Sequence, residues 1–194
     1  MGDSVYFLIA VSVVLIFAFP LYWGLSTSLR APMDTFTVTG LGIPGIHFDP
    51  TLNNWLDQLV VPEMRKSIYN SIVISISSSF LALALGIPSA YALARFQFKL
   101  IQNRDITIWF LSQRVLPPVA TVIPFYLVLQ TFSLLDTHLA LILINTTFTL
   151  PFAVVIMRQA FLDLPIELEE ASMMDGASHF GAFWRIALAL SAPA

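Results

Sequence analysis

Long apolar segments are the feature that most constrains this chain. Each is long enough to supply the roughly 20 residues that a helix needs to cross about 30 Å of hydrocarbon. Because a backbone in lipid must satisfy its own polar groups, such segments form helices. The sequence therefore predicts an all-α membrane protein with several crossings. Its spans are expected at about residues 5–27, 67–94, 106–133 and 139–158, and a further one begins at 183–194.

The composition agrees with an integral membrane protein. Hydrophobic residues make up 57% of the chain and charged residues only 11%, whereas soluble domains carry about 25% charged residues. The net charge of −3 provides no basic surface for nucleic acid, and the absence of Cys excludes disulfides and thiolate metal sites. No metal site is expected, because His47, His138 and His179 lie far apart without ligand spacing.

Two polar segments separate the spans, a long loop at 28–66 and a shorter one at 159–182. Lys and Arg are more frequent on the cytoplasmic side of a membrane protein. Five of them fall near span ends on the side of the 159–182 loop and three on the other side. The count predicts a cytoplasmic 159–182 loop, a cytoplasmic N-terminus and an outward-facing 28–66 loop. The five are Arg95, Lys99, Arg104, Arg158 and Arg185, and the three are Arg30, Arg65 and Lys66.

The 159–182 loop contains the stretch L-P-I-E-L-E-E-A-S-M-M-D-G-A-S, residues 164–178, which predicts two helices joined by a turn. Pro165 suits a first helical position, preceded by Asp163 or Leu164 as the cap. Three glutamates follow in the first turns, where the helix dipole favours negative charge. Gly176 can adopt the left-handed conformation that ends a helix, and Ser178 suits the N-cap of the second helix.

The same stretch resembles a known family. Glu170-Ala171-Ser172, two residues and then Asp175-Gly176-Ala177 are similar to the EAA loop of permease subunits of bacterial ABC importers. Ser172 replaces the second alanine of the family pattern, and Ala189 stands where the family usually has proline. The piece A-Y-A-L-A-R-F-Q-F resembles the same permease family. The carbohydrate-type permeases within that family are resembled by three further pieces, P-L-Y-W-G-L-S-T-S-L-R, D-P-T-L-N-N-W and L-S-Q-R-V-L-P-P-V-A-T-V-I-P-F.

This resemblance implies a polytopic helix bundle of the ABC importer permease (MetI-like) type, with one transmembrane domain over residues 1–194. It implies a non-catalytic subunit of a sugar or sugar-alcohol importer in the bacterial inner membrane. No Walker A pattern is present, so ATP and Mg are expected on a separate nucleotide-binding ATPase and no cofactor on this chain. Further expected partners are a second homologous permease, a periplasmic or lipid-anchored substrate-binding protein, and membrane lipid. The residues expected to couple to the ATPase are Glu170, Ala171, Asp175, Gly176 and Ala177.

A substrate path is a weaker hypothesis. Polar groups inside a membrane require partners, so the face of the 139–158 span that carries them is expected to point into the bundle or a water-filled cavity. Packing against neighbouring helices and sugar binding remain open as alternatives, and so does binding by the companion permease alone. Arg114 could line a path, snorkel to the interface or form a buried pair. The candidates are Arg114, Tyr126, Asn145 and Thr149.

Other functions remain as alternatives. An ion-coupled secondary transporter usually has an acidic residue within the membrane, whereas Asp105 and Asp136 lie at span ends. A membrane-embedded enzyme would need a convergent set of His, Cys or paired carboxylates, which the expected spans lack. A membrane-embedded structural or accessory subunit is a further alternative. The last apolar segment, 183–194, has twelve residues rather than the roughly 20 of a span. Because the family continues through this span and a sixth, we expect a permease truncated after the start of the fifth span.

Overall fold

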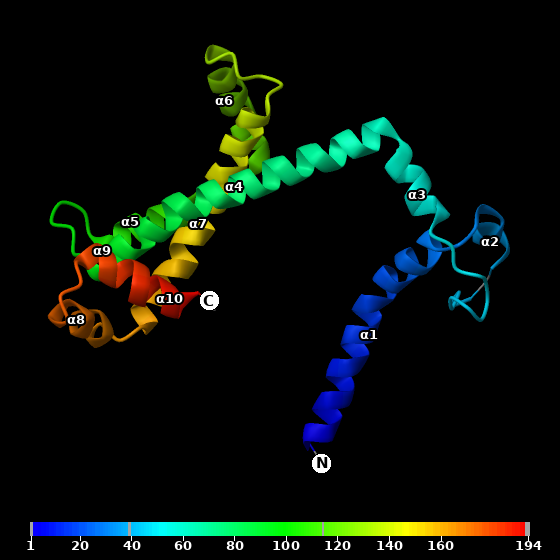
Figure 1. Ribbon diagram of the computed structural model, residues 1–194, viewed down its shortest axis with the longest axis horizontal. Coiled ribbons are helices and arrows are strands. Elements are labelled where there is room, and N and C mark those ends of the chain that lie inside the picture. The colour runs from blue at the N-terminus through cyan, green and yellow to red at the C-terminus, as the bar shows by residue number, and fades with distance from the viewer. Residues whose placement is uncertain (1, 39, 114, 193–194) are drawn as a thin grey trace. The chain divides into compact units, whose positions relative to one another are not determined.

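The computed structural model describes residues 2–38, 40–113 and 115–192, and the regular secondary structure of these residues is helical (Figure 1). This confirms the predicted all-α class. Contacts between Cα atoms divide the chain inside α4 into two compact units, residues 1–69 and 70–194. The elements are α1 Gly2–Ser28, α2 Pro32–Thr37, α3 Asn53–Val60, α4 Pro62–Arg95, α5 Asn103–Ser112, α6 Pro118–Thr131, α7 His138–Asp163, α8 Glu167–Met174, α9 His179–Ala182, the π-helix η1 Phe183–Ala187, and α10 Leu188–Ser191.

Three helices in the described part of the chain are long and apolar enough to cross a membrane. They are α1 over Ser4–Ser28, α4 and α7. The expected spans at 5–27, 67–94 and 139–158 fall within these helices. Both α4 and α7 continue past the expected span ends, so that α7 reaches Asp163 inside the polar 159–182 segment.

The span expected over 106–133 is not a single helix in the structure. The structure has two shorter helices there, because α5 ends at Ser112 and α6 begins at Pro118. The break precedes Pro117 and Pro118. A proline lacks the N–H that would bond within a helix and disfavours the helical conformation of the residue before it. Arg114, one of the candidate substrate-path residues, lies outside the described residues.

The N-terminal unit folds part of the long 28–66 loop around Arg30. This side chain is 2% exposed, and its guanidinium lies 5.1 Å from the ring centre of Trp23 and 5.3 Å from that of Phe48. Cation–π contacts of this kind stabilise a buried cation. Asn54 adds a link, because its amide donates to the carbonyl of Arg30 at 2.7 Å. The loop is therefore an ordered structure built on the end of α1.

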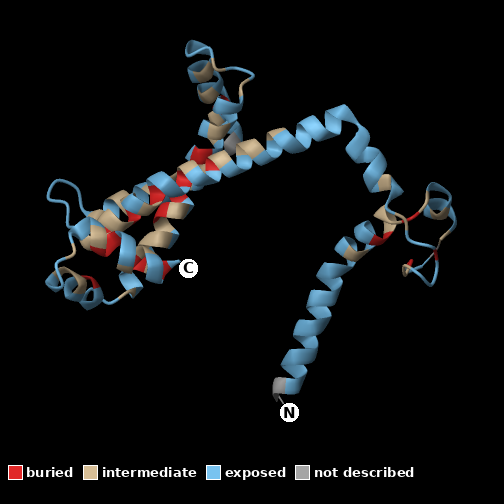
Figure 2. Ribbon diagram, in the orientation of Figure 1, coloured by how far each residue is buried: buried red, intermediate tan, exposed pale blue. Residues whose placement is uncertain are grey.

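The C-terminal unit is built on the close packing of α4 against α7, where the buried residues lie (Figure 2). A Cβ placed on Gly86 of α4 would come within 2.7 Å of the Cβ of Ala153 on α7. Further along, Thr146 donates to the carbonyl of Ser78 at 3.4 Å. Small residues let membrane helices approach this closely, and hydroxyls can bond to a neighbouring backbone. Small and hydroxyl residues of α4 thus let it pack closely against α7.

Candidate coupling site

Helix α8 and the turn after it have the local structure that the 164–178 stretch predicts. Gly176 has φ +90°, in the left-handed region. The N–H of Gly176 donates to the carbonyl of Met173 at 3.0 Å, and the N–H of Ala177 donates to that of Ser172 at 3.1 Å. This pair of bonds is the Schellman motif that ends a helix. Ser178 then caps α9, because its hydroxyl accepts from the N–H of Gly181 at 3.1 Å.

The predicted start of α8 is wrong by two residues. The helix begins at Glu167, with Ile166 at the N-cap position, and Pro165 precedes it. No side chain caps this end, so neither Asp163 nor Leu164 serves as the cap. The carbonyl of Pro165 instead accepts from the N–H of Leu168 at 3.4 Å, which forms a turn ahead of the helix.

Glu169 anchors α8 to α4. Its carboxylate is 4% exposed and accepts hydrogen bonds from the hydroxyl of Tyr91 at 2.5 Å and from Nε of Arg95 at 2.7 Å. Nη2 of Arg95 also lies 2.7 Å from the carboxylate and donates to the carbonyl of Leu164 at 3.1 Å. A buried carboxylate is stable only when it is paired and hydrogen-bonded, and this one is both.

An aromatic cluster lies beneath this ion pair. The ring of Tyr91 is 5.5 Å from that of Phe161 on α7 and 4.7 Å from that of Phe183 on η1. Phe161 is fully buried, and so is Ala90 on α4. Edge-to-face and tilted contacts at these distances are favourable. The cluster therefore joins three membrane-directed segments, α4, α7 and η1, directly beside α8.

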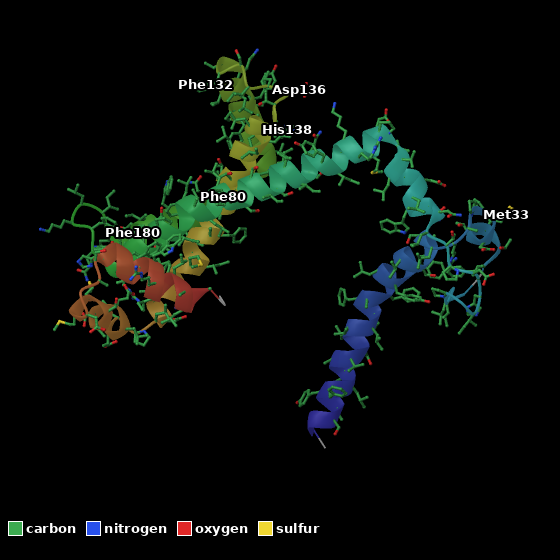
Figure 3. The ribbon with its side chains drawn as sticks, viewed as in Figure 1. Met33, Phe80, Phe132, Asp136, His138 and Phe180 are labelled. Atoms are coloured by element: carbon green, nitrogen blue, oxygen red, sulfur yellow. The ribbon has the colours of Figure 1, made fainter. Side chains whose placement is uncertain are left out.

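The residues expected to couple to an ATPase lie in the last turns of α8 and in the turn that follows it, and most of them are accessible. Glu170, Ala171, Asp175 and Gly176 are exposed, and Ala177 is half-buried. Large apolar side chains are exposed beside them, with Met174 89% and Phe180 73% accessible. Phe180 projects from α9 at the surface of the C-terminal unit (Figure 3). The structure thus presents a mixed polar and apolar face around a rigid turn.

Sequence reasoning missed the inward role of Glu169. It treated Glu167, Glu169 and Glu170 alike, as acids near a helix N-terminus. A signal was present in A-Y-A-L-A-R, because Tyr91 and Arg95 are four residues apart and so share one face of α4. A phenol and a guanidinium on one face near the end of a span indicate an acidic partner.

The candidate substrate-path residues do not form one described cluster. The amide of Asn145 donates to the carbonyl of Leu141 at 2.9 Å, and the hydroxyl of Thr149 donates to that of Asn145 at 2.8 Å, so both bond within α7. Tyr126 on α6 is exposed. A cavity of about 160 Å³ lies nearby, against other residues of α6 and α7 and the end of α5. Its lining is Gln113, Leu116, Thr121, Phe125, Thr147, Phe148 and Pro151.

Known proteins resemble this chain in sequence. A probable ABC transporter permease of Sinorhizobium fredii, y4oR, is 33% identical over 90% of this chain and 61% of its own length. The inner membrane ABC transporter permease YcjP of Escherichia coli is 31% identical over 92% of this chain and 62% of its own length. The trehalose/maltose transport permease MalG of Thermococcus litoralis is 31% identical, over 95% and 65% respectively. The chain thus spans about three fifths of the length of these relatives.

A solved structure shares the fold. It is a bacterial ABC transporter involved in the import of the acidic polysaccharide alginate, matched with a TM-score of 0.74 at 20% identity over 100% of this chain and 67% of the solved chain. No protein-family model matches the sequence. The chain is thus similar in sequence to ABC transporter permeases and has the fold of a bacterial ABC importer's membrane subunit.

Proposed function

We propose that this chain is the transmembrane subunit of an ATP-driven importer in the bacterial inner membrane, with its N-terminus in the cytoplasm. Its α8–turn–α9 segment (residues 167–182) docks onto a nucleotide-binding ATPase subunit. ATP hydrolysis on that subunit drives the spans between outward-open and inward-open states. The chain itself has the mechanical role, and ATP and Mg bind to the partner.

The observation that carries this proposal is the anchoring of α8 through Glu169. Coupling requires that a movement of the docked helix is transmitted to the spans. The bonds from Tyr91 and Arg95 tie α8 to the end of α4, and the rings of Phe161 and Phe183 tie the same point to α7 and η1. Because packed interfaces of this kind move as units, displacement of α8 moves all three segments.

The exposed face of the segment suits a partner protein. Binding energy at interfaces is concentrated in a few apolar anchors surrounded by polar residues. Met174 and Phe180 supply such anchors, and Glu170 and Asp175 supply charges beside them. Gly176 holds the turn between the two helices in one conformation. We assign this face to the ATPase, with Ala171 and Ala177 as the small residues that allow close approach.

The names of several relatives support a carbohydrate substrate. They include transport-system permeases for trehalose/maltose, diacetylchitobiose and sulfoquinovosyl glycerol. We propose a sugar or sugar alcohol as the substrate of this importer. The cavity at α6 and α7 offers the amide of Gln113 and aromatic rings of Phe125 and Phe148, which lie 5.8 Å apart. Arg114, Tyr126, Asn145 and Thr149 remain candidates for other parts of the path.

The remaining partners follow from the same role. The folded 28–66 loop would face outward, where a substrate-binding protein delivers the sugar. The exposed apolar surfaces of α1 and α4 would contact lipid and a second homologous permease. Val14, Ile16 and Phe17 on α1 are exposed residues of this kind. Phe80 on α4 is another (Figure 3).

The test is uptake of labelled sugars by proteoliposomes that contain this permease with its co-purified subunits. ATP inside the vesicles should drive uptake, and a non-hydrolysable ATP analogue should not. Collapse of ion gradients with ionophores should leave the rate unchanged. Uptake driven by an ion gradient without ATP would identify a secondary transporter instead. Failure of any ATPase to co-purify would favour an accessory subunit.

A further inference from the structure

The C-terminal unit also has a basic cavity that no residue of the docking segment, 167–182, lines. A cavity of about 400 Å³ opens between the end of α4, the start of α5 and the last turns of α7. Three arginines, from three different segments, line it. We call it the arginine cavity. Its lining is Leu93, Ala94, Arg95, Phe96, Gln97, Phe98, Gln102, Asn103, Arg104, Arg158 and Leu162.

The positive charge of this cavity is only partly compensated. Arg95 is paired with Glu169, whereas no described residue forms an ion pair or a hydrogen bond with the side chain of Arg104 or Arg158. Nε of Arg158 is buried without a hydrogen-bond partner among the described residues. No Asp or Glu lines the cavity. A buried N–H without an acceptor costs free energy, so the arrangement favours an added group that carries acceptor oxygens and negative charge.

The surroundings of the cavity are apolar. The segment between α4 and α5 exposes four large apolar side chains, with Leu100 99% accessible and Ile101 57%. Phe96 and Phe98, which also line the cavity, are nearly half exposed. The cavity lies where two apolar spans end, at Arg95 of α4 and near Asp163 of α7. Apolar side chains next to arginines at the end of a span match the boundary between acyl chains and headgroups.

We propose that the arginine cavity binds the phosphate of an anionic phospholipid, with Arg104 and Arg158 as its ligands. Guanidinium groups form paired, charge-assisted hydrogen bonds with phosphate oxygens. The acyl chains of the lipid then lie against Phe96, Phe98 and the neighbouring apolar side chains. The placement in the cytoplasmic leaflet rests on the orientation in the proposed function. The binding itself depends only on the geometry of this unit.

The test measures lipid retention by native mass spectrometry on the permease, purified with the subunits that accompany it. Phosphatidylglycerol, phosphatidylcholine and inorganic phosphate are added separately. Phosphatidylglycerol should bind more tightly than phosphatidylcholine. Arg104→Gln and Arg158→Gln should each weaken its binding about tenfold, because each removes charge-assisted hydrogen bonds to the phosphate that a surface charge does not make. Arg158→Lys, which keeps the charge, should retain more binding than Arg158→Gln.

Lys99→Gln is the matched control, because Lys99 is an exposed cation of the same connecting segment and does not line the cavity. It should change binding less than twofold, on the order of surface electrostatics alone. Equal losses for all three substitutions, or equal retention of the two lipids, would overturn the proposal. Binding of inorganic phosphate that excludes the lipid would show a free-anion site instead. Loss of ATPase co-purification with unchanged lipid binding would contradict the proposed function and leave this inference standing.

Discussion

Glu169 and Arg95 form a buried ion pair that joins two segments 74 residues apart in the sequence, with Nε of Arg95 2.7 Å from the carboxylate. The side chains of both residues are less than 10% exposed. The pair holds α8 in a fixed position on α4. Removal of either partner would leave the other charged group buried without compensation.

The first prediction concerns this pair. Glu169→Ala should lower the free energy of unfolding by about 3–5 kcal/mol, the range for removing one partner of a buried ion pair. Chemical unfolding of the purified permease in detergent measures it. The double substitution Arg95→Leu with Glu169→Leu should recover part of the loss, because two apolar side chains leave no unpaired charge. A single substitution as stable as the parent would mean that the pair does not anchor α8.

The second prediction concerns Glu170, which lies next to Glu169 and is exposed. If Glu170 makes a charge-assisted contact with the ATPase, Glu170→Ala should weaken assembly by about 1.5–3 kcal/mol. The stability of the isolated permease should stay unchanged, because no described residue bonds to this side chain. Titration of the ATPase subunit onto the permease in detergent gives the affinity. Asp57→Ala, at an exposed acid of the N-terminal unit, is the control and should bind like the parent.

The third prediction concerns the contact between α4 and α7. A Cβ added at Gly86 would lie 2.7 Å from the Cβ of Ala153, a distance that forces the helices apart. Gly86→Ala should therefore destabilise the permease by about 1–3 kcal/mol, as overpacking does. Adding Ala153→Gly should restore part of the stability, because it removes the opposing carbon atom. Unfolding in detergent measures both variants.

Gly24→Ala is the control for that series. Gly24 lies inside α1, and no atom lies within 4 Å of its added Cβ. Alanine is the better helix former by up to about 1 kcal/mol. The substitution should therefore leave stability unchanged or raise it. Equal losses at Gly24 and Gly86 would show that the effect does not come from contact with α7.

The two helix ends of the coupling segment show what sequence could predict. The glycine turn and the Ser178 cap depend on a few neighbouring residues, and both were predicted correctly. The α-helical class and the spans at α1, α4 and α7 follow from length and apolar composition. Local patterns of this kind are readable because the interactions that produce them lie within a few residues.

Glu169 shows why contacts between residues far apart in the sequence could not be predicted. Three glutamates lie within four positions, and helix-dipole reasoning treats them alike. The one that turns inward is selected by Tyr91 and Arg95, 78 and 74 residues away. The break between α5 and α6 has a local signal in Pro117 and Pro118, but bundles of membrane helices also tolerate prolines within spans, so these two residues alone do not predict a break.

The last prediction concerns Gly176, where local geometry and the proposed coupling meet. Its φ of +90° is a conformation that a residue with a Cβ adopts only at a cost of roughly 1–2 kcal/mol. No atom lies within 4 Å of an added Cβ, so the cost arises from the backbone and not from a collision. Gly176→Val should strain the turn most, Gly176→Ala less, and Gly176→Asn least, because Asn tolerates the left-handed region.

The turn lies beyond α8 and outside the packed contacts of α4 and α7, so expression and membrane insertion of the Gly176 variants should stay near normal. Coupling should fail instead, with ATP hydrolysis separated from uptake or with release of the ATPase. Uptake and ATPase activity of the three variants, compared in one assembled transporter at matched expression, give the order. Transport at the parental rate by all three would mean that the turn does not carry the coupling, whereas loss of expression in all three would place its role in folding.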